Sequence, residues 1–569
     1  MGKEMVTAAS IVFSLVFGGF LLLVLRFCDA LLLKPRRRRS RLEKQGIRGP
    51  DPSFFYGNIA EMKRIIEAQE PLVEKSAASE ELLHAWPSVV FPHLEQWRQE
   101  YVCPDGSWIF IKLIERVFKI NTAQVHPIEL LRLSKTLAWR MTRIMMTGPT
   151  FLYSTGNIQL LCITDTEMVK EVIHYTSLNL GKPMYLSTER GPLLGRGILS
   201  SNGPYWAYQR KIIAPEFYLH RVKDMVNLMA ESTLTMLGTW ENRSESWEGK
   251  MEIRVDEDLR SLSADIISRA CFGRSYVQGE KIFSKLQSLQ KIMSKGNIGV
   301  PGLRYIPNQH NRDIWKLERE IDSMILEVVK SRSDDDKNKC DLLQSILSTA
   351  GSYGDNSDIP ADISLNKFIV DNCKNIYFAG HETTAIAASW CLMTLATHPD
   401  WQARSRKEVI EICGTNIPTA NMLRNMKVLT MVIQETLRLY PPVAYVVREA
   451  LEDIHFKGIN IPKGINIQVP IPIMHQHQEL WGLDAHEFKP DRFANGTSGA
   501  CKIPQAYMPF GVGSRTCVGQ NFAMAELKVI LSLILSKFSF TLSPAYHHSP
   551  VFRLVIQPQH GVSILLEKL

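Results

Sequence analysis

The sequence predicts a mainly α-helical protein with a minor β part. Apolar residues recur at helical spacing over most of the chain, and one apolar run from about 363 to 397 is long enough for a single long helix. Two short β-like runs, Thr150–Tyr153 and Ile158–Ile163, flank Gly156-Asn157 and predict a hairpin. The C-terminal third alternates short apolar runs with glycine and proline, which is typical of an irregular, tightly turned region.

The composition is that of an ordinary globular chain. It has 569 residues, of which 45% are hydrophobic and 22% are charged, and this excludes a disordered chain, a collagen-like repeat and a polytopic transporter. The formal net charge of +8 comes from residues 1–40 and 102–147, and the rest of the chain is close to neutral. We therefore expect no nucleic-acid partner, because nucleic-acid-binding domains carry a basic patch on the folded body.

The first 33 residues predict a single-pass transmembrane anchor. Ala8–Leu25 hold no charged residue, and eighteen apolar residues are just enough to cross a lipid bilayer. The basic residues Lys34 and Arg36–Arg39 follow the apolar run, whereas the alternative of a cleaved signal peptide requires them before it. By the positive-inside tendency, the chain beyond residue 33 faces the cytosol.

The remaining chain divides into a basic, proline-rich linker over 34–52 and a domain over 53–569. Gly49-Pro50-Asp51-Pro52 should form a stiff break at the end of the linker. Inside the domain, Thr164 and Glu167 have the spacing of a capping box and predict the start of a helix.

One of the ten cysteines differs from the others. No two cysteines have the C-x-x-C spacing of a zinc ribbon, but Cys517 lies in FGVGSRTCVG, residues 510–519, just before an apolar helical stretch from Val518 to Phe538. Glycines before the cysteine let the backbone approach a flat ligand, and a helix N-terminus favours a thiolate. A thiolate bound to a haem iron promotes O–O bond cleavage. The pattern favours a haem-thiolate site over an ordinary buried cysteine.

This decapeptide resembles the haem-binding signature of the cytochrome P-450 superfamily, F-G-x-G-x-R-x-C-x-G, at every fixed position. The resemblance implies a cytochrome P-450 fold with haem b as the cofactor. It makes Cys517 the axial ligand of the iron, places Phe510 near the sulfur and brings Arg515 to a haem propionate. It also assigns cofactor-binding positions to the loop glycines: Gly511, Gly513 and Gly519.

The long helix contains AGHETT, residues 379–384. Small residues at 379 and 380 would let the helix pass close to a flat cofactor. A hydroxyl with a nearby carboxylate and water can relay the protons that reduction of O2 requires. The resemblance implies that Thr383 is the oxygen-side threonine and Glu382 its acidic neighbour. Taken alone, the motif would be an ordinary helix surface.

A third motif, Glu435-Thr-Leu-Arg438, places an acid and a base at i and i+3 on one helix face, where they can pair. The resemblance adds Arg492 as a third member, with Asp491 where the family usually has glutamate. We expect this triad to hold the haem-side core and to take no part in chemistry.

A fourth motif, Trp206-Ala-Tyr-Gln-Arg210, aligns two side chains at i and i+4. The resemblance directs both toward one haem propionate and places Arg448 at another propionate contact. Taken singly, each of these residues could equally be a packing residue, and their order relative to Cys517 favours the binding role.

The resemblance covers roughly 53–101 and 148–569 and extends to the plant microsomal seventy-two clan, in particular its gibberellin-oxidising branch. It implies a monooxygenase of the endoplasmic reticulum membrane that inserts one oxygen of O2 into a small apolar substrate, such as a diterpenoid, by hydroxylation or epoxidation. Electrons come from NADPH through NADPH-cytochrome reductase. The expected contributors to the substrate pocket are 184–198, Ala379, Val443–Val447 and Pro558–Gly561.

The segment 102–147 departs from the family, in which the chain runs almost directly from Tyr101 to Gly148. Three interpretations are open: a gene-model error such as an unspliced intron, a membrane-facing insertion, and a partner-binding loop. Two other functions also stay open, namely a haem-thiolate isomerase or dehydrase that uses no O2, and a catalytically impaired haem- or ligand-binding protein. Dependence of turnover on NADPH and O2 separates a monooxygenase from both.

Overall fold

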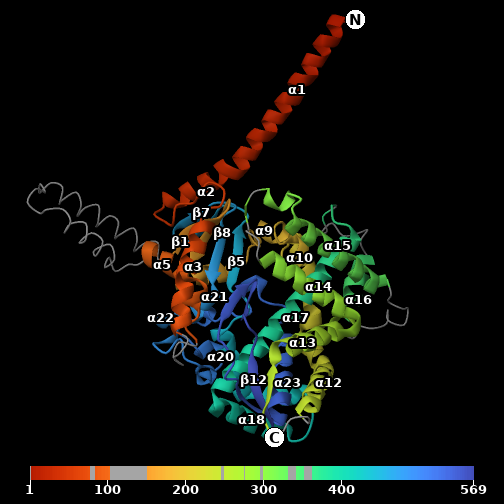
Figure 1. Cartoon of the computed structure of the whole chain (residues 1–569). Helices are drawn as coiled ribbons and strands as arrows, with labels where there is room; N and C mark the ends of the chain where they lie inside the picture. Colours follow the sequence, from red (N-terminus) through yellow and green to blue (C-terminus); the bar gives the residue numbers. More distant parts are fainter. Residues whose placement is uncertain are drawn as a thin grey trace, which may run out of the picture.

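The structure is a computed structural model (Figure 1). It describes residues 2–76, 84–102, 150–244, 249–273, 276–294, 299–300, 302–330, 341–351, 360 and 362–569. The unusual segment at 102–147 lies outside the described residues, apart from Val102, which ends a helix.

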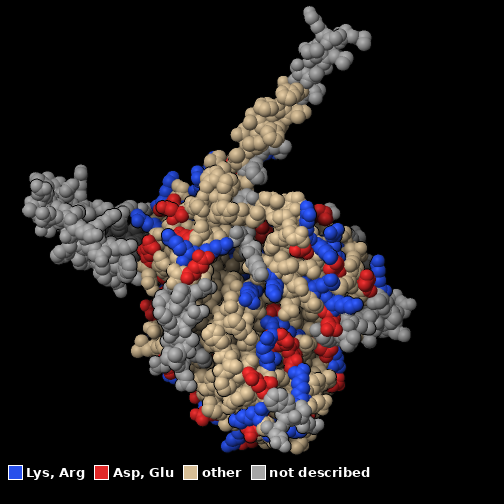
Figure 2. All heavy atoms as spheres, in the orientation of Figure 1, with Lys and Arg blue, Asp and Glu red and all other residues tan. Residues whose placement is uncertain are grey.

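The N-terminal helix α1 (Gly2–Cys28) stands away from the body of the protein in Figure 1. A short π-helical turn, Asp29–Leu33, joins it to α2 (Lys34–Glu43). The helical stretch Phe13–Glu43 contains an 18-residue window that is long and apolar enough to cross a membrane, with a mean hydropathy of 2.2. Figure 2 shows its described upper part without charged side chains and shows basic side chains where it meets the body.

The first half of the linker that the sequence predicted over 34–52 forms a helix, since 34–43 are α2. This helix packs against β2 (Ile158–Ile163) and β7 (Ile459–Ile461). Leu42 is fully buried there, and the buried Arg39 donates from Nη2 to the Pro50 carbonyl at 2.9 Å. Helix α2 is therefore fixed to the body, because a buried apolar side chain and a buried guanidinium both hold it.

A five-stranded sheet lies beneath α2, in the order β1-β2-β8-β5-β3. The hairpin predicted from Gly156-Asn157 is confirmed, since β1 and β2 pair antiparallel with Thr150 opposite Ile163. Strand β2 also pairs with β8 in parallel, which brings the C-terminal third of the chain against the first hairpin. The strands of this sheet not yet given are β1 (Thr150–Thr155), β3 (Leu180–Gly181), β5 (Tyr445–Ala450) and β8 (Asn466–Pro470).

Three smaller sheets complete the β part, in the orders β4-β12-β9, β10-β11 and β6-β7. Their strands are β4 (Met251–Arg254), β6 (Ile454–Phe456), β9 (Phe538–Leu542), β10 (Pro550–Arg553), β11 (Val555–Pro558) and β12 (Ser563–Lys568).

The rest of the body is mostly helical, as predicted. The helices of its first half are α3 (Ile59–Ser76), α4 (Pro87–Val90), α5 (Pro92–Val102), α8 (Thr166–His174), α9 (Met184–Ser187), α10 (Gly191–Leu194), α11 (Gly203–Ile213), α12 (Leu219–Ser244), α13 (Val255–Phe272), α14 (Tyr276–Ser294), α15 (Gln309–Lys330) and α16 (Leu342–Gly351). The second half adds α17 (Leu365–Thr397), α18 (Pro399–Cys413), α19 (Ala420–Asn425), α20 (Lys427–Leu439), α21 (Ile471–His475), α22 (Gln478–Trp481) and α23 (Gln520–Lys537).

Helix α17 is the long apolar helix that the sequence predicted, and it forms the centre of the helical core. Its N-cap is Ser364, whose Oγ accepts from the Lys367 amide. Most of its residues are buried, because α13, α20 and α23 pack around it. A helix that is apolar all round belongs in the middle of a large domain.

The N-cap of α8 differs from the predicted one. The sequence predicted Thr164 as its cap, but Asp165 is the N-cap, and its carboxylate accepts from the Met168 amide at 2.7 Å. An aspartate three residues before a free helical amide caps as well as a threonine does.

Candidate active site

A cavity of about 1140 Å³ lies between α17 and the loop that carries Cys517. It is lined mainly by apolar side chains from α17, β5, β10 and the segment around α10. Each stretch that the sequence named as a pocket contributor supplies at least one lining residue, including Arg190, Ala379, Val443 and His560. The cavity also takes residues from α3, α4 and the loop 547–549, which the sequence did not indicate.

The loop from Phe510 to Gly519 turns as its glycines require. Gly511 and Gly513 both have positive φ angles, 69° and 70°, and a Cβ at 513 would lie 2.5 Å from the Ile173 carbonyl oxygen. The Cys517 amide donates to the Phe510 carbonyl at 2.8 Å and closes the loop. Only glycine adopts this turn without strain.

The Cys517 thiol lines the cavity. It is solvent-accessible and yet surrounded by protein, since the surface it exposes faces the cavity. Burial raises the pKa of this thiol, while a hydrogen bond from the Gly519 amide and the charge of Arg210 lower it by less. The protein alone therefore favours the thiol over the thiolate, and a metal ion would supply the charge that deprotonates it.

Three arginines from distant parts of the chain line the same cavity. Arg515 lies flat on the Trp206 ring at 3.7 Å and donates to the Ser201 carbonyl at 2.8 Å. Arg210, one turn after Trp206 on α11, lies 5.7 Å from that ring and donates to the Thr516 carbonyl at 3.0 Å. Arg448 of β5 is buried and donates to backbone carbonyls only. The structure thus brings Trp206 and all three arginines to one wall.

This wall carries uncompensated positive charge. Burial, followed by the charges of Arg448 and Arg210, lowers the pKa of Arg515 to about 9, and burial lowers the pKa of Arg448 to about 10. The sequence reasoning missed Lys182, which lines the same cavity and whose pKa is lowered by burial and by Arg448 and Arg515. Among the described residues that line the cavity, none is an aspartate or glutamate. A haem fits this donor set, because its two propionates would neutralise the cations while its iron faces the cysteine.

Helix α17 forms the opposite wall, and Thr383 lies on it with its hydroxyl donating to the Ala379 carbonyl at 2.6 Å. Gly380 lines the cavity too, but it also allows α13 to pack closely, since a Cβ there would lie 2.6 Å from Ile267 Cδ1. The small residue predicted at 380 is thus needed against a neighbouring helix as well as beside a cofactor.

Glu382 is not brought into the cavity with Thr383. Its Oε1 is 3.3 Å from Arg260 Nη2 of α13, and its Oε2 is buried and 3.8 Å from His381 Nδ1. Burial lowers the pKa of His381 to about 4, so this histidine is neutral at physiological pH. The acid of the motif is therefore held by an arginine behind the cavity wall.

A second acid that the sequence reasoning missed, Glu526 of α23, is buried behind the same wall. The hydroxyls of Ser263 and Thr384 hydrogen-bond to its carboxyl, and Thr384 itself lines the cavity. Its Oε1 has no hydrogen-bond partner. Burial raises the pKa of Glu526 to about 8, so it is largely protonated at neutral pH. One visible signal was a lone acid in the apolar helix between Val518 and Phe538.

We expect Glu526→Gln to make thermal stability less dependent on pH. A carboxyl whose folded-state pKa is raised stabilises the fold below its unfolded value, near 4.5, and this stability is lost as pH rises toward about 8. The wild-type protein should lose at most about 1.4 kcal/mol per pH unit in this window, and the neutral variant should not. The melting temperature measured from pH 5 to 9 tests this, with the exposed Glu411→Gln as a control. A constant difference from the wild type at every pH would contradict it.

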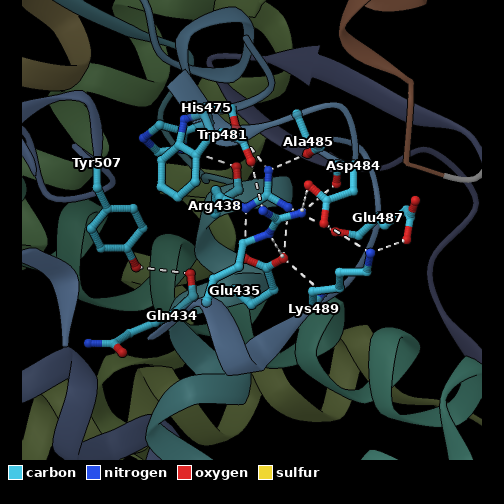
Figure 3. A network of polar contacts seen from close by, with 11 residues as sticks. Gln434, Glu435, Arg438, His475, Trp481, Asp484, Ala485, Glu487, Lys489 and Tyr507 are labelled. Atoms are coloured by element: carbon cyan, nitrogen blue, oxygen red, sulfur yellow. Dashed lines mark hydrogen bonds and ion pairs between the residues drawn. The ribbon is translucent and has the colours of Figure 1, made fainter. Parts of the chain in front are cut away.

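The three residues of the predicted triad lie together, and Figure 3 shows Glu435 and Arg438 at the centre of a network of polar contacts. Glu435 and Arg438 are fully buried and form a bidentate pair, with both N···O distances at 2.7 Å. Arg492 Nε lies 3.4 Å from Glu435 Oε1, and the Lys489 amide donates to the same oxygen at 2.8 Å. Both oxygens of the buried carboxylate are therefore engaged.

Arg438 also holds the loop that follows α21. It donates to the carbonyls of His475, Ala485 and Glu487 and lies under the Trp481 ring at 5.0 Å. The substitution of aspartate at 491 has no effect on the triad, because Asp491 is exposed and pairs with Arg404. A guanidinium that bonds three carbonyls and a carboxylate fixes backbone geometry, which supports the structural role.

Comparison with known proteins supports these observations. The family model for cytochrome P450 matches residues 130–566. The relative named cytochrome P450 714C2, of Oryza sativa subsp. japonica, is 48% identical over 95% of this chain and 94% of its own length. Cytochrome P450 714A2 of Arabidopsis thaliana is 42% identical over 93% of both chains. Cytochrome P450 714B3 of Zea mays is 41% identical over the whole of this chain and 98% of its own length.

Solved structures show the same fold. The crystal structure of the cytochrome P450DA haem domain superposes with a TM-score of 0.61 at 25% identity, covering 74% of this chain and 89% of that one.

Proposed function

Since this chain belongs to the cytochrome P450 family and is a monooxygenase of that family, we propose that it oxidises a diterpenoid such as a gibberellin, using electrons that a reductase delivers from NADPH. The observation that carries this proposal is a large apolar cavity that receives the Cys517 thiol on one side and Thr383 on the other. The resemblance to the gibberellin-oxidising branch supports the substrate class. We propose the endoplasmic reticulum membrane as the location, with the domain in the cytosol, on the basis of α1 and the basic residues after it.

The haem would be held by Cys517 and by the cationic wall. Cys517 would bind its iron, while Arg210, Arg448, Arg515 and Lys182 would neutralise its propionates. When bound, this group supplies the activation of O2 for insertion into a C–H bond or an alkene. The apolar walls of the cavity would bind the substrate and exclude water from it.

Thr383 is proposed to hold a proton-donating hydroxyl on the oxygen side of the cavity. Its hydroxyl now donates to the Ala379 carbonyl, and exchange of this bond for one to water would turn the proton toward the cavity. Glu382 would act as an acid behind Thr383, in the position that its ion pair with Arg260 gives it, next to His381. The neutral carboxyl of Glu526, linked to Thr384, is a second acid on this side.

We expect Thr383→Ala to keep the haem and to lower the fraction of NADPH that yields product by about 100-fold or more, since a positioned proton-transfer group contributes about 10²- to 10⁴-fold. The measurement compares NADPH consumed with product formed. Thr383→Ser is the matched control, because it keeps the hydroxyl and should keep most of the coupling. If the alanine variant couples as well as the wild type, the relay role is refuted.

The overall proposal is tested by incubating the holoprotein in microsomes with gibberellins, reductase, NADPH and O2. Oxygenated product that disappears when either NADPH or O2 is withheld supports the proposal. Product that persists without O2 would favour the isomerase or dehydrase, and a substrate-induced spectral shift without product would favour an impaired binding protein.

A further inference from the structure

One cation that lines the cavity, Arg190, lies apart from the four that would face the haem propionates. The charges of Arg448 and Arg515 lower the pKa of Lys182, and those of Arg448 and Arg210 lower the pKa of Arg515, so these four cations form one group. Arg190 also lines the cavity, but none of these four affects its pKa, which responds to Tyr185 and Glu189 instead. The charge of Arg190 is therefore separate from the cationic wall that the other four side chains form.

Arg190 is buried, with 8% of its surface exposed, at the start of α10. Its Nη1 donates to the Met293 carbonyl at the end of α14, and among the described residues its Nε has no hydrogen-bond partner. A buried guanidinium with an open donor is costly unless an acceptor satisfies it.

The protein itself offers Arg190 little compensation. Among the residues that the structure describes, no carboxylate forms an ion pair with it. Glu189 is the nearest acid in its electrostatic environment, but the pKa of Glu189 responds more to Arg304, and Glu189 does not line the cavity. Although burial lowers the pKa of Arg190 to about 10, the side chain keeps its charge at neutral pH.

The surroundings of Arg190 define the ligand. Leu193, Leu194 and Ile198 line the cavity beside it, and Phe378 lines it from α17. One cation in an apolar environment matches one anionic group on an apolar body, and a guanidinium binds a planar carboxylate with two parallel hydrogen bonds. A multiply charged phosphate would require further cations on this side of the cavity.

We propose that Arg190 binds the carboxylate of an apolar monocarboxylic acid substrate and holds its hydrocarbon body toward Cys517. This inference rests on the proposed oxidation of an apolar substrate and adds to it the group by which the substrate is oriented. A fixed carboxylate at one end of the cavity decides which carbon reaches the other end, so Arg190 determines the site of oxidation.

The test is a spectral titration of the holoprotein with two acid and ester pairs: a tetracyclic diterpenoid monocarboxylic acid with its methyl ester, and lauric acid with methyl laurate. The wild type should bind each acid about 10- to 100-fold more tightly than its ester, the range for loss of a charged hydrogen bond. Arg190→Gln should bind acid and ester equally, at the wild-type ester affinity. Arg304→Gln, the neighbouring arginine outside the cavity, should keep the acid preference.

Each result has one meaning. If the wild type shows no acid preference in either pair, or if Arg190→Gln keeps it, the role of Arg190 is overturned. If only the lauric pair binds and shows the preference, the role of Arg190 stands and the diterpenoid substrate fails. A carbon monoxide difference spectrum with the wild-type amplitude verifies that Arg190→Gln is folded. If Arg190→Gln does not fold, Arg190→Lys takes its place, and this variant should retain part of the acid preference.

Discussion

Replacing Cys517 with alanine should abolish the red-shifted Soret band of the reduced, carbon monoxide-bound protein. This band requires a thiolate on the iron, and Cys517 is the thiol that the structure brings to the cavity opposite the oxygen-side threonine. Monooxygenase activity should fall to background, since the electron density that promotes O–O cleavage comes from this ligand. The measurement is the difference spectrum in microsomes, followed by product analysis.

The control for this substitution is Cys501→Ala, because Cys501 lies in the same part of the chain but hydrogen-bonds to the Ile503 carbonyl and does not line the cavity. It should leave the band unchanged. Retention of the red-shifted band in Cys517→Ala would refute the assignment of the ligand. Absence of the band in the wild type would mean that the haem site is not assembled, and the segment 102–147 would be the first region to examine by deletion.

Arg438→Ala should destabilise the protein by about 3–5 kcal/mol, the range for leaving one partner of a buried ion pair unpaired. The variant leaves the buried Glu435 carboxylate with Arg492 as its cation and the Lys489 amide as a donor, and it leaves three carbonyls without their donor. Those carbonyls belong to the segment between α21 and the Cys517 loop, so we expect haem incorporation to fall with stability. Thermal unfolding and the amplitude of the carbon monoxide spectrum measure the two effects.

Two variants separate geometry from charge in this prediction. Arg438→Lys keeps the charge but cannot form the bidentate pair, so it should lose most of the same stability. Arg404→Ala removes an exposed pair with Asp491 and should cost less than about 1 kcal/mol. If Arg438→Lys is as stable as the wild type, the bidentate geometry of the Arg438 guanidinium is not what stabilises this part of the core.

The elements that the sequence predicted well are those with a strong local pattern. The glycines before Cys517, the apolar run of α17 and the spacing of Glu435 and Arg438 each depend on residues a few positions apart, so local physics decides them. The sequence did not indicate that the first half of the linker is a helix packed on the body, because its basic run contains one apolar residue, Leu42, that is buried there.

The residues that the sequence did not reveal are those that gain meaning only from distant partners. Lys182 is one basic residue among 66, and nothing next to it in the chain shows that it faces the cavity. The stretch 184–198 was expected at the pocket, but the sequence did not single out Arg190 within it. Glu382 belongs to a recognisable motif, yet its carboxylate is turned to Arg260, which lies 122 residues earlier. Tertiary packing, and no local pattern, decides whether such a carboxylate faces the cavity or a neighbouring helix.

Helix α1, the turn Asp29–Leu33 and α2 form one continuous helical path, so the rotation of α1 about its axis is tied to the orientation of the domain. Arg39 and Leu42 clamp the lower end of this path to the body, so a rotation of the membrane helix about its axis must turn the whole domain. One added residue in this path would rotate the domain by about 100° and raise it by about 1.5 Å relative to the lipid. In a membrane-anchored chain, the register of this helix would therefore set which face of the domain is turned to the bilayer.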